Sequence, residues 1–173
     1  MNKIFLILIV FLSISCSMIK KQTEPTVPVW YKVQEEGYVI SCAEAESYEE
    51  YLAKLAAKNI AFQTYPIKIE KYLNNYVANN CITSGDDAIQ AELDKVFKHF
   101  TNYLMNIADV QIELGEVYTI PIKGSHVKCY VQLKIEQKFL HQEFVEFLET
   151  SDLYMNLKLR AVLKKCFKNK IKE

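Results

Sequence analysis

The chain has three histidines, which are its first candidates for acid–base catalysis or metal binding. His99 is expected to be solvated on a helix, and His126 follows Ser125 in a predicted turn. A serine beside a histidine is no sign of a catalytic pair, because a nucleophile and its base usually come from distant positions. His141 and Glu143 are two residues apart, a spacing at which side chains do not face each other on a helix. The histidines therefore favour neither a catalytic site nor a metal site.

Sequence motifs that activate a nucleophile or hold a cofactor are also missing. The sequence contains no glycine-rich phosphate loop, no His-Glu-x-x-His motif and no serine elbow. We therefore predict a non-enzymatic protein with no metal and no other cofactor. An enzyme of the hydrolase type, with a site that the sequence does not reveal, ranks third behind the two non-enzymatic functions given below.

Four cysteines follow Cys16 in the chain: Cys42, Cys81, Cys129 and Cys166. They form no Cys-x-x-Cys pair, so zinc and thioredoxin-type sites are not supported. In an exported protein four cysteines can pair in three ways, and the sequence does not choose between them. Cys42 and Cys129 fall on apolar strand faces, where the simpler interpretation is that they are buried free thiols.

The N-terminus carries the most specific signal of the sequence. Lys3 precedes an unbroken apolar run over residues 4–12, and a Ser-Ile-Ser segment then leads to Cys16. Nine helical residues reach only about 14 Å, against a hydrocarbon core of about 30 Å, so the run is too short to span a bilayer. A positive start, a short apolar run and small residues describe a signal peptide. With Cys16 next, the segment resembles a bacterial lipoprotein signal, in which this cysteine becomes the lipid-modified first residue.

The lipoprotein interpretation divides the chain into three parts. Residues 1–15 are the predicted signal peptide, residues 16–29 are the lipidated cysteine and a flexible tether, and residues 30–173 form one domain. Acyl chains such as palmitate hold a protein on a membrane because each buried methylene contributes about 0.8 kcal/mol. Ser17 after the cysteine resembles lipoproteins of the bacterial outer membrane. The alternative is a plain signal peptide that is cut near Ser15 or Ser17.

The overall charge is balanced, with 21 Lys and Arg against 21 Asp and Glu. This balance argues against nucleic-acid binding, which needs a clustered excess of bases. The charges are nevertheless segregated. The charged residues of 35–50 are six acids and no base, and those of 153–173 are seven bases and the single acid Glu173. The C-terminal helix is either an ordinary solvated face or a binder of an anionic surface. The candidates for such surface binding are Lys158, Arg160, Lys164, Lys165 and Lys168.

The front half of the domain is predicted to be a strand and a long helix. Residues 37–43 are rich in β-formers and begin at a glycine. Apolar residues at helical spacing follow from a start near Glu44 or Ser47, and Pro66 interrupts them, which predicts one kinked helix or a pair of helices. The apolar residues before the proline are Tyr48, Leu52, Leu55, Ala56 and Phe62.

The rear half is predicted to contain another helix, an antiparallel hairpin and C-terminal helices. An apolar stripe over residues 89–107 marks the clearest helix, with two aspartates at its start. Two β-patterned segments, 110–120 and 127–135, flank a turn at residues 123–125. We expect helices to cover one sheet face and water the other. The pattern as a whole predicts an α+β fold with the C-terminal helices packed on one sheet face.

The order of these features resembles a known family of lipoproteins. It is similar to the roughly twenty-kilodalton outer-membrane lipoproteins known as surface antigens in gastric epsilon-proteobacteria, whose domain is similar to the N-terminal part of a flagellar assembly protein. The resemblance covers residues 28–137, and it implies a small domain that assembles or binds at the cell envelope, with no catalytic residues. The residues that carry it are Cys16, Trp30, Tyr31, the strand 37–41, the helix alanines Ala43, Ala45, Ala53, Ala56 and Ala57, and the strand 129–135.

The sequence leaves more than one function open. Our leading hypothesis is a lipid-anchored envelope protein that acts by protein or surface contact, with its membrane face undecided. Eleven tyrosines and an unpaired hairpin edge favour self-association or an envelope protein partner over catalysis. The alternative is a small-ligand-binding lipoprotein with a cavity between the helices and the hairpin.

Overall fold

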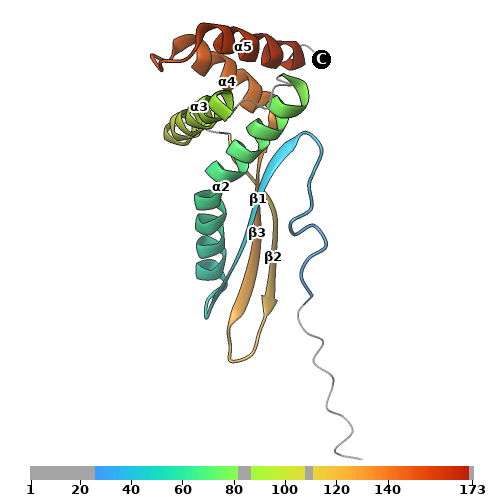
Figure 1. Cartoon of the computed structure of the whole chain (residues 1–173). Coiled ribbons are helices and arrows are strands. Elements are labelled where there is room, and N and C mark those ends of the chain that lie inside the picture. Colours follow the sequence, from blue (N-terminus) through green and yellow to red (C-terminus); the bar gives the residue numbers. More distant parts are fainter. Residues whose placement is uncertain (1–25, 82–86, 108–110, 172–173) are drawn as a thin grey trace, which may run out of the picture.

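The computed structural model describes residues 26–81, 87–107 and 111–171, so the predicted signal peptide and Cys16 lie outside the described residues. The described part forms a three-stranded antiparallel sheet and four helices, which confirms the predicted α+β fold (Figure 1). None of its helices has the length and apolar character needed to cross a membrane. In chain order the elements are β1 (Tyr38–Ser47), α2 (Glu50–Asn80), α3 (Asp87–Asn106), β2 (Glu113–Pro121), β3 (Val127–Glu136), α4 (Gln137–Thr150) and α5 (Leu157–Ile171).

Strand β3 lies at the centre of the sheet, between β1 and β2. It pairs antiparallel with both neighbours, and its pairing with β1 covers all ten residues of each strand. The β2–β3 hairpin turns at Gly124 and Ser125, whose φ angles are 77° and 62°. Two successive residues with positive φ are what a tight hairpin turn requires. The predicted hairpin at this position is confirmed.

The boundary between β1 and α2 lies later than predicted. The helix was expected to start near Glu44 or Ser47, but β1 continues to Ser47 and α2 begins at Glu50. Residues 44–47 are held in the sheet because they pair with residues 127–130 of β3. Pairing between strands therefore overrides the local helical pattern here.

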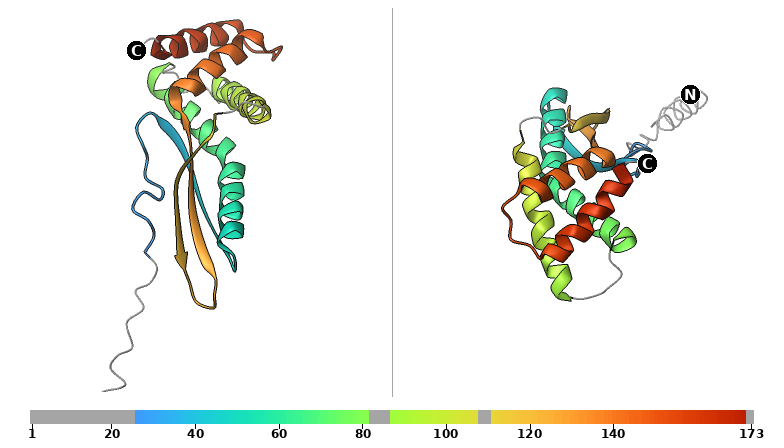
Figure 2. Two further views of the ribbon diagram at one scale, coloured as in Figure 1. Left: turned by 180° about the vertical axis from the view of Figure 1, so that it is seen from behind. Right: turned by 90° about the horizontal axis from the view of Figure 1, so that it is seen from above.

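Helix α2 is one helix of 31 residues with Pro66 inside it. Figure 1 shows that it changes direction near its middle, as expected because proline lacks an N–H group and its ring clashes with the preceding turn. The alternative of a single kinked helix is thus confirmed. The first half of α2 lies along the sheet, and its second half joins α3, α4 and α5 in a helical cap at one end of the sheet (Figure 2).

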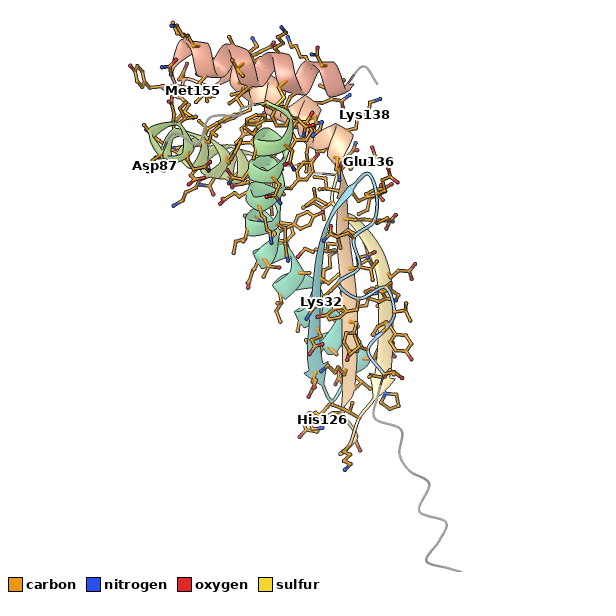
Figure 3. The ribbon with its side chains drawn as sticks, turned by 45° about the vertical axis from the view of Figure 1, so that its right-hand side comes forward. Lys32, Asp87, His126, Glu136, Lys138 and Met155 are labelled. Atoms are coloured by element: carbon orange, nitrogen blue, oxygen red, sulfur yellow. A yellow bond between two sulfur atoms is a disulfide. The ribbon has the colours of Figure 1, made fainter. Side chains whose placement is uncertain are left out.

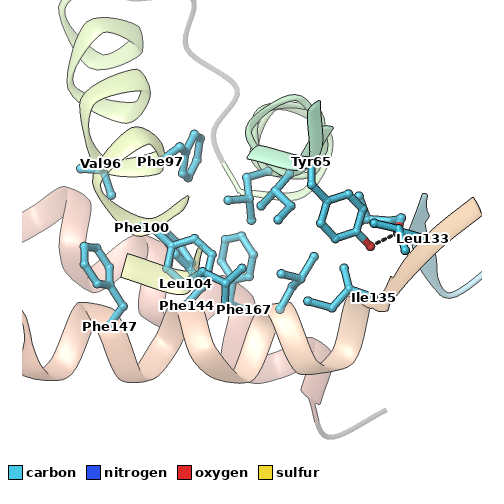
Figure 4. Close-up of a cluster of buried hydrophobic side chains, with 14 of the residues drawn as sticks. Tyr65, Val96, Phe97, Phe100, Leu104, Leu133, Ile135, Phe144, Phe147 and Phe167 are labelled. Carbon is cyan, nitrogen blue, oxygen red and sulfur yellow. Dashed lines mark hydrogen bonds between the residues drawn. The ribbon is translucent and has the colours of Figure 1, made fainter. Parts of the chain in front are cut away.

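The helical cap has an aromatic core (Figure 4). The ring of Phe144 on α4 lies 5.6 Å from Phe97 and 5.0 Å from Phe100, both on α3. Phe167 on α5 lies 4.7 Å from the same Phe144 ring. All four side chains are fully buried and share one hydrophobic core with the strand residues under α2. The predicted packing of the C-terminal helices against the sheet is therefore confirmed.

The sheet face away from α2 is also covered near its centre. Tyr31 packs against Tyr130 of β3, with ring centroids 5.0 Å apart. Figure 3 shows the segment that carries Lys32 running along the strands. Tyr130 and Gln132 are only 2% and 4% exposed, so the expectation of a wetted face is wrong at this point. Burial, with a further contribution from the negative charge of Glu44, raises the pKa of Tyr31 to about 12.

Candidate functional site

The first half of α2 packs on the sheet through a line of alanines. Ala53, Ala57 and Ala61 are completely buried against the strands. Their small side chains allow the helix backbone to come close to the sheet, and the Ser41 hydroxyl of β1 donates a hydrogen bond to the Ala61 carbonyl at 2.7 Å. These contacts determine which side of α2 faces the sheet.

The opposite side of this half-helix carries large apolar side chains that no other part of the described structure covers. Tyr51 is 70% exposed, and Leu52, Leu55 and Phe62 are 41–47% exposed. Leu52, Leu55, Asn59 and Phe62 follow at spacings of three, four and three residues, which places them on one side of the helix. None of these residues carries a charge. We call Tyr51, Leu52, Leu55, Asn59 and Phe62 the outer stripe.

The same side of α2 is buried in the second half of the helix. The alternation of three and four continues through Pro66 to Ile69, Leu73 and Tyr76. Ile69 and Leu73 are fully buried in the core that contains the aromatic residues of α3 and α4. The Tyr76 ring lies 4.7 Å from Phe167 of α5. The helical cap therefore covers one half of a continuous stripe and leaves the outer stripe bare.

The positions of the buried residues explain why different sides of α2 are buried in its two halves. They recur at every fourth position from Ala53 to Val77. A step of four residues advances about 40° around a helix, so six steps carry the buried line about 240° around α2. The line starts against the sheet and ends against the helical cap. The apolar spacing that predicted this helix, at Leu52, Leu55 and Phe62, consequently lies on its exposed side.

The three histidines lie in separate places. His99 is exposed on α3, as expected. His126 packs against the Tyr48 ring at the hairpin end of the sheet, with ring centroids 3.7 Å apart and the rings tilted by 36°. His141 is buried on α4, where the Tyr72 hydroxyl lies 2.6 Å from its Nε2. Burial raises the pKa of Tyr72, so its hydroxyl stays protonated. Within the described ranges, no three His, Cys, Asp or Glu side chains gather as a metal site.

The five candidate bases of α5 differ in their surroundings. Lys164 and Lys168 lie 3.2 and 2.6 Å from Glu149 of α4, and these two hydrogen bonds lower the pKa of the Glu149 carboxyl. Arg160 donates a hydrogen bond to a backbone carbonyl of the α4–α5 connection. Lys158 and Lys165 are exposed and form no ion pair within the described structure. Binding of an anionic surface by α5 remains a prediction. Lys158 and Lys165 are the best placed of the five candidates for it, because they are exposed and make no ion pair within the described residues.

An open hollow of about 760 Å³ lies beside the α4–α5 connection. It is lined by Lys158, Arg160 and loop residues 151–157. The Ser151 Oγ and Arg160 Nε atoms are buried and have no hydrogen-bond partner in the described structure. The ligand-binding alternative expected a cavity between the helices and the hairpin, but this hollow lies at the far end of the helical cap (Figure 3).

Three of the six acids in residues 35–50 are paired with lysines of β3. Lys128 Nζ lies 2.8 Å from Glu44 and 3.4 Å from Glu46, and Lys134 Nζ lies 3.3 Å from Glu35. The hydrogen bond to Glu44 raises the pKa of Lys128. The acidic run is therefore locally neutralised and does not form an unbroken negative surface.

The cysteines have two different states. Cys81 at the end of α2 and Cys166 of α5 form a disulfide, whereas Cys42 and Cys129 are free thiols. Cys129 is fully buried, as expected, and Cys42 is half-buried. Burial raises the pKa of the Cys42 thiol, which keeps it protonated and slow to react. The sequence did not indicate this pairing, because residues 81 and 166 become neighbours only when α5 packs on the cap.

The outer stripe was also not recognised from the sequence. The spacing of Leu52, Leu55 and Phe62 predicts the helix but does not predict that these residues are exposed. The available signal was the spacing of Ala53, Ala57 and Ala61, because small residues at every fourth position mark a side suited to close packing. A helix with small residues on one side and bulky residues on the other could bury either side. Here the side with small residues faces the sheet, because it allows the helix backbone to come close to the strands.

Comparisons with protein families, with curated proteins and with solved structures found no match to this chain. The resemblance to surface-antigen lipoproteins therefore stays a prediction from the residues that carry it.

Proposed function

We propose that this chain is a lipid-anchored protein of a bacterial cell envelope that acts by protein contact and not by catalysis. The outer stripe of α2 is the observation that carries the proposal. Contiguous exposed apolar patches on soluble domains commonly mark interaction sites. The exposed rings of Tyr51 and Phe62 belong to the residue types that are enriched at the centres of protein interfaces.

Two features support an exported location. The disulfide between Cys81 and Cys166 is of a kind that persists in oxidising compartments and is rare in the cytosol. The N-terminal segment has the charge, length and small residues of a signal peptide, with Cys16 as the lipid attachment site. Ser17 favours the outer membrane as the destination.

An anchor at Cys16 would orient the domain. Figure 1 shows the first described residues toward the hairpin end of the sheet and α5 at the opposite end. Residue 26 follows Cys16 by ten positions, which span at most about 35 Å of extended chain. The attachment point is then nearer to the hairpin end than to the helical cap, which favours an orientation with the hairpin end toward the membrane. The outer stripe lies along the membrane-proximal half of the molecule.

Membrane fractionation of cells that make the full chain tests the anchor. Cys16→Ala is expected to move the protein from the membrane to the soluble fraction, and globomycin is expected to cause an unprocessed precursor to accumulate. Cys42→Ala is the matched control, because it also removes one thiol and should leave the protein on the membrane. Normal processing and membrane association of Cys16→Ala would contradict the lipoprotein proposal.

The contact function has its own test. The double variant Leu55→Lys/Phe62→Lys places two charges on the outer stripe and leaves the alanine side intact. We expect wild-type chain to form high-mass complexes in native electrophoresis of solubilised membranes, and this variant to lose them. Lys54→Glu changes the charge of an exposed position on α2 away from the stripe and serves as the control. Complexes that persist in the Leu55→Lys/Phe62→Lys variant would count against the stripe as the contact surface.

Binding of a small anionic ligand is the second candidate function. The buried Ser151 Oγ and Arg160 Nε beside the α4–α5 hollow favour it, because buried polar atoms normally have hydrogen-bond partners. Inorganic phosphate or acetate is then expected to raise the thermal midpoint of wild-type chain and not that of Arg160→Gln. An equal shift in both proteins, or no shift in either, would reject this candidate.

A further inference from the structure

We propose that the outer stripe binds the outer stripe of a second copy of this chain, with the two α2 helices parallel. The inference deepens the proposed function, because it names the partner of the contact surface. It rests on the spacing, polarity and position of the residues that are bare on the first half of α2.

The outer stripe has the repeat of a two-stranded coiled coil. Coiled-coil positions are named a to g, and a and d face the partner helix. In the first repeat Leu52 is at a and Leu55 is at d, and in the second Asn59 is at a and Phe62 is at d. The buried residue Ala57 falls at position f, on the far side of the helix, where it packs on the sheet. The helix can therefore form a seam with a partner without disturbing its own domain.

Asn59 favours a second copy over an unrelated partner. A single asparagine at an a position is a known means of specifying register and a two-stranded state, because the two asparagines can hydrogen-bond to each other across the seam. In a parallel pair Asn59 meets Asn59, while Leu52, Leu55 and Phe62 each meet their own equivalents. An apolar partner would instead leave the Asn59 amide without a hydrogen-bond partner, which is costly.

The flanking positions favour the parallel orientation. Tyr51 and Lys58 are at g, and Ala56 and Gln63 are at e. Parallel helices bring g of one chain to e of the other, so Tyr51 meets Ala56 and Lys58 meets Gln63. No like charges meet in this arrangement. In an antiparallel pair the g positions of the two helices face each other. Lys58 could then lie near Lys58 of the other copy, and these like charges would repel.

The rest of the domain is compatible with this pairing. The outer stripe ends at Phe62, one turn before Pro66, where α2 changes direction and continues into the helical cap. In a parallel pair both hairpin ends point the same way, so two Cys16 anchors can reach one membrane. This orientation is the one that a membrane-bound pair needs.

The size of the surface predicts a weak pair. Two aromatic rings and two leucines, roughly half exposed, offer on the order of 500 Å² per copy, or on the order of 1,000 Å² in total, which is at the lower limit of specific interfaces. A common membrane compensates, because tethering raises the effective concentration of one copy around another. Pairing should therefore be strongest in the anchored, full-length protein.

Crosslinking through one introduced cysteine, in membranes of cells that make the full chain, tests the inference. Cys129 is fully buried and Cys81 is paired with Cys166, so neither competes. The background is Cys42→Ser, which removes the half-buried free thiol. Leu52→Cys and Phe62→Cys are each expected to give a disulfide-linked dimer after mild oxidation, because parallel seam positions bring identical residues within the roughly 7 Å between Cα atoms that a disulfide spans. Lys54→Cys, also exposed on α2 but away from the seam, is the matched control and should remain monomeric.

Each other result overturns a defined part of the inference. Dimers that form only when Leu52→Cys and Phe62→Cys chains are mixed would show an antiparallel pair. Crosslinks to a different protein would reject a second copy as the occupant, and equal crosslinking of Lys54→Cys or none at all would reject the seam. The same fractions report the anchor separately, since chain in the soluble fraction contradicts the lipoprotein proposal whatever its crosslinks. All three substitutions are at exposed positions, where the cost to folding is usually within about 0.5 kcal/mol.

Discussion

Cys81 and Cys166 form a disulfide that ties the C-terminal end of α2 to α5, across a sequence separation of 85 residues. A cross-link that closes a loop of this length restricts the unfolded chain strongly, and removal of such a bond typically costs about 2–5 kcal/mol. We expect Cys81→Ser/Cys166→Ser to lower the free energy of unfolding by that amount in urea titrations. Cys42→Ser, which removes a free thiol, should change it little. Equal stability of the double variant and wild type would show that the helical cap does not depend on the bond.

The two sides of α2 should respond oppositely to substitution. Ala57→Leu adds volume where the helix lies against the sheet, and overpacking of this kind typically costs about 1–3 kcal/mol. Leu55→Ala removes volume from the exposed side and should change stability by less than about 0.5 kcal/mol in the monomer. Urea unfolding of both variants at low protein concentration measures the contrast. A larger loss for Leu55→Ala would mean that the helix is rotated relative to the sheet.

Tyr65 joins α2 to β1 through a single buried hydrogen bond. Its hydroxyl donates to the Val39 carbonyl at 2.7 Å, as the dashed line in Figure 4 shows. Tyr65→Phe keeps the ring and removes the donor, so we expect a loss of about 1–2 kcal/mol in the free energy of unfolding. Tyr118→Phe, at a position that is 43% exposed, is the matched control. Equal effects of the two substitutions would argue against the Tyr65 bond.

We expect Glu149 to make the packing of α5 on α4 sensitive to acid. The hydrogen bonds from Lys168 and Lys164 lower its pKa in the folded protein below the ordinary value of 4.5. The folded state then binds fewer protons than the unfolded state between these two pKa values, so the stabilisation is present above the unfolded pKa and is lost as the pH falls through the folded pKa. Stability of the wild type should therefore fall more steeply below about pH 5 than that of Glu149→Gln.

Thermal unfolding from pH 7 to pH 3 measures this difference. Glu36→Gln changes another exposed carboxylate and should keep the wild-type pH dependence. Added salt should reduce the advantage of the wild type, because the charges are at the surface and are screened. A Glu149→Gln curve parallel to that of the wild type would reject the linkage.

Local patterns in the sequence were sufficient for the class of fold. The alternation of β3, the hairpin turn at Gly124 and Ser125 and the apolar stripe of α3 all occur where they were predicted. Each of these depends on a repeat or a turn within a few consecutive residues, and such signals do not need the rest of the chain. The signal-like N-terminus and Cys16 are likewise local patterns, and they remain predictions.

Tertiary structure alone decided which surfaces are available for function. The alanine side of α2 was buried because small side chains allow the closest approach to the sheet, and this left Leu52, Leu55 and Phe62 exposed. Glu149 pairs with two of the five candidate bases of α5, and the disulfide joins a cysteine at the end of α2 to a cysteine within α5. These outcomes depend on distances between residues that are far apart in the sequence, and such distances exist only after the chain has folded.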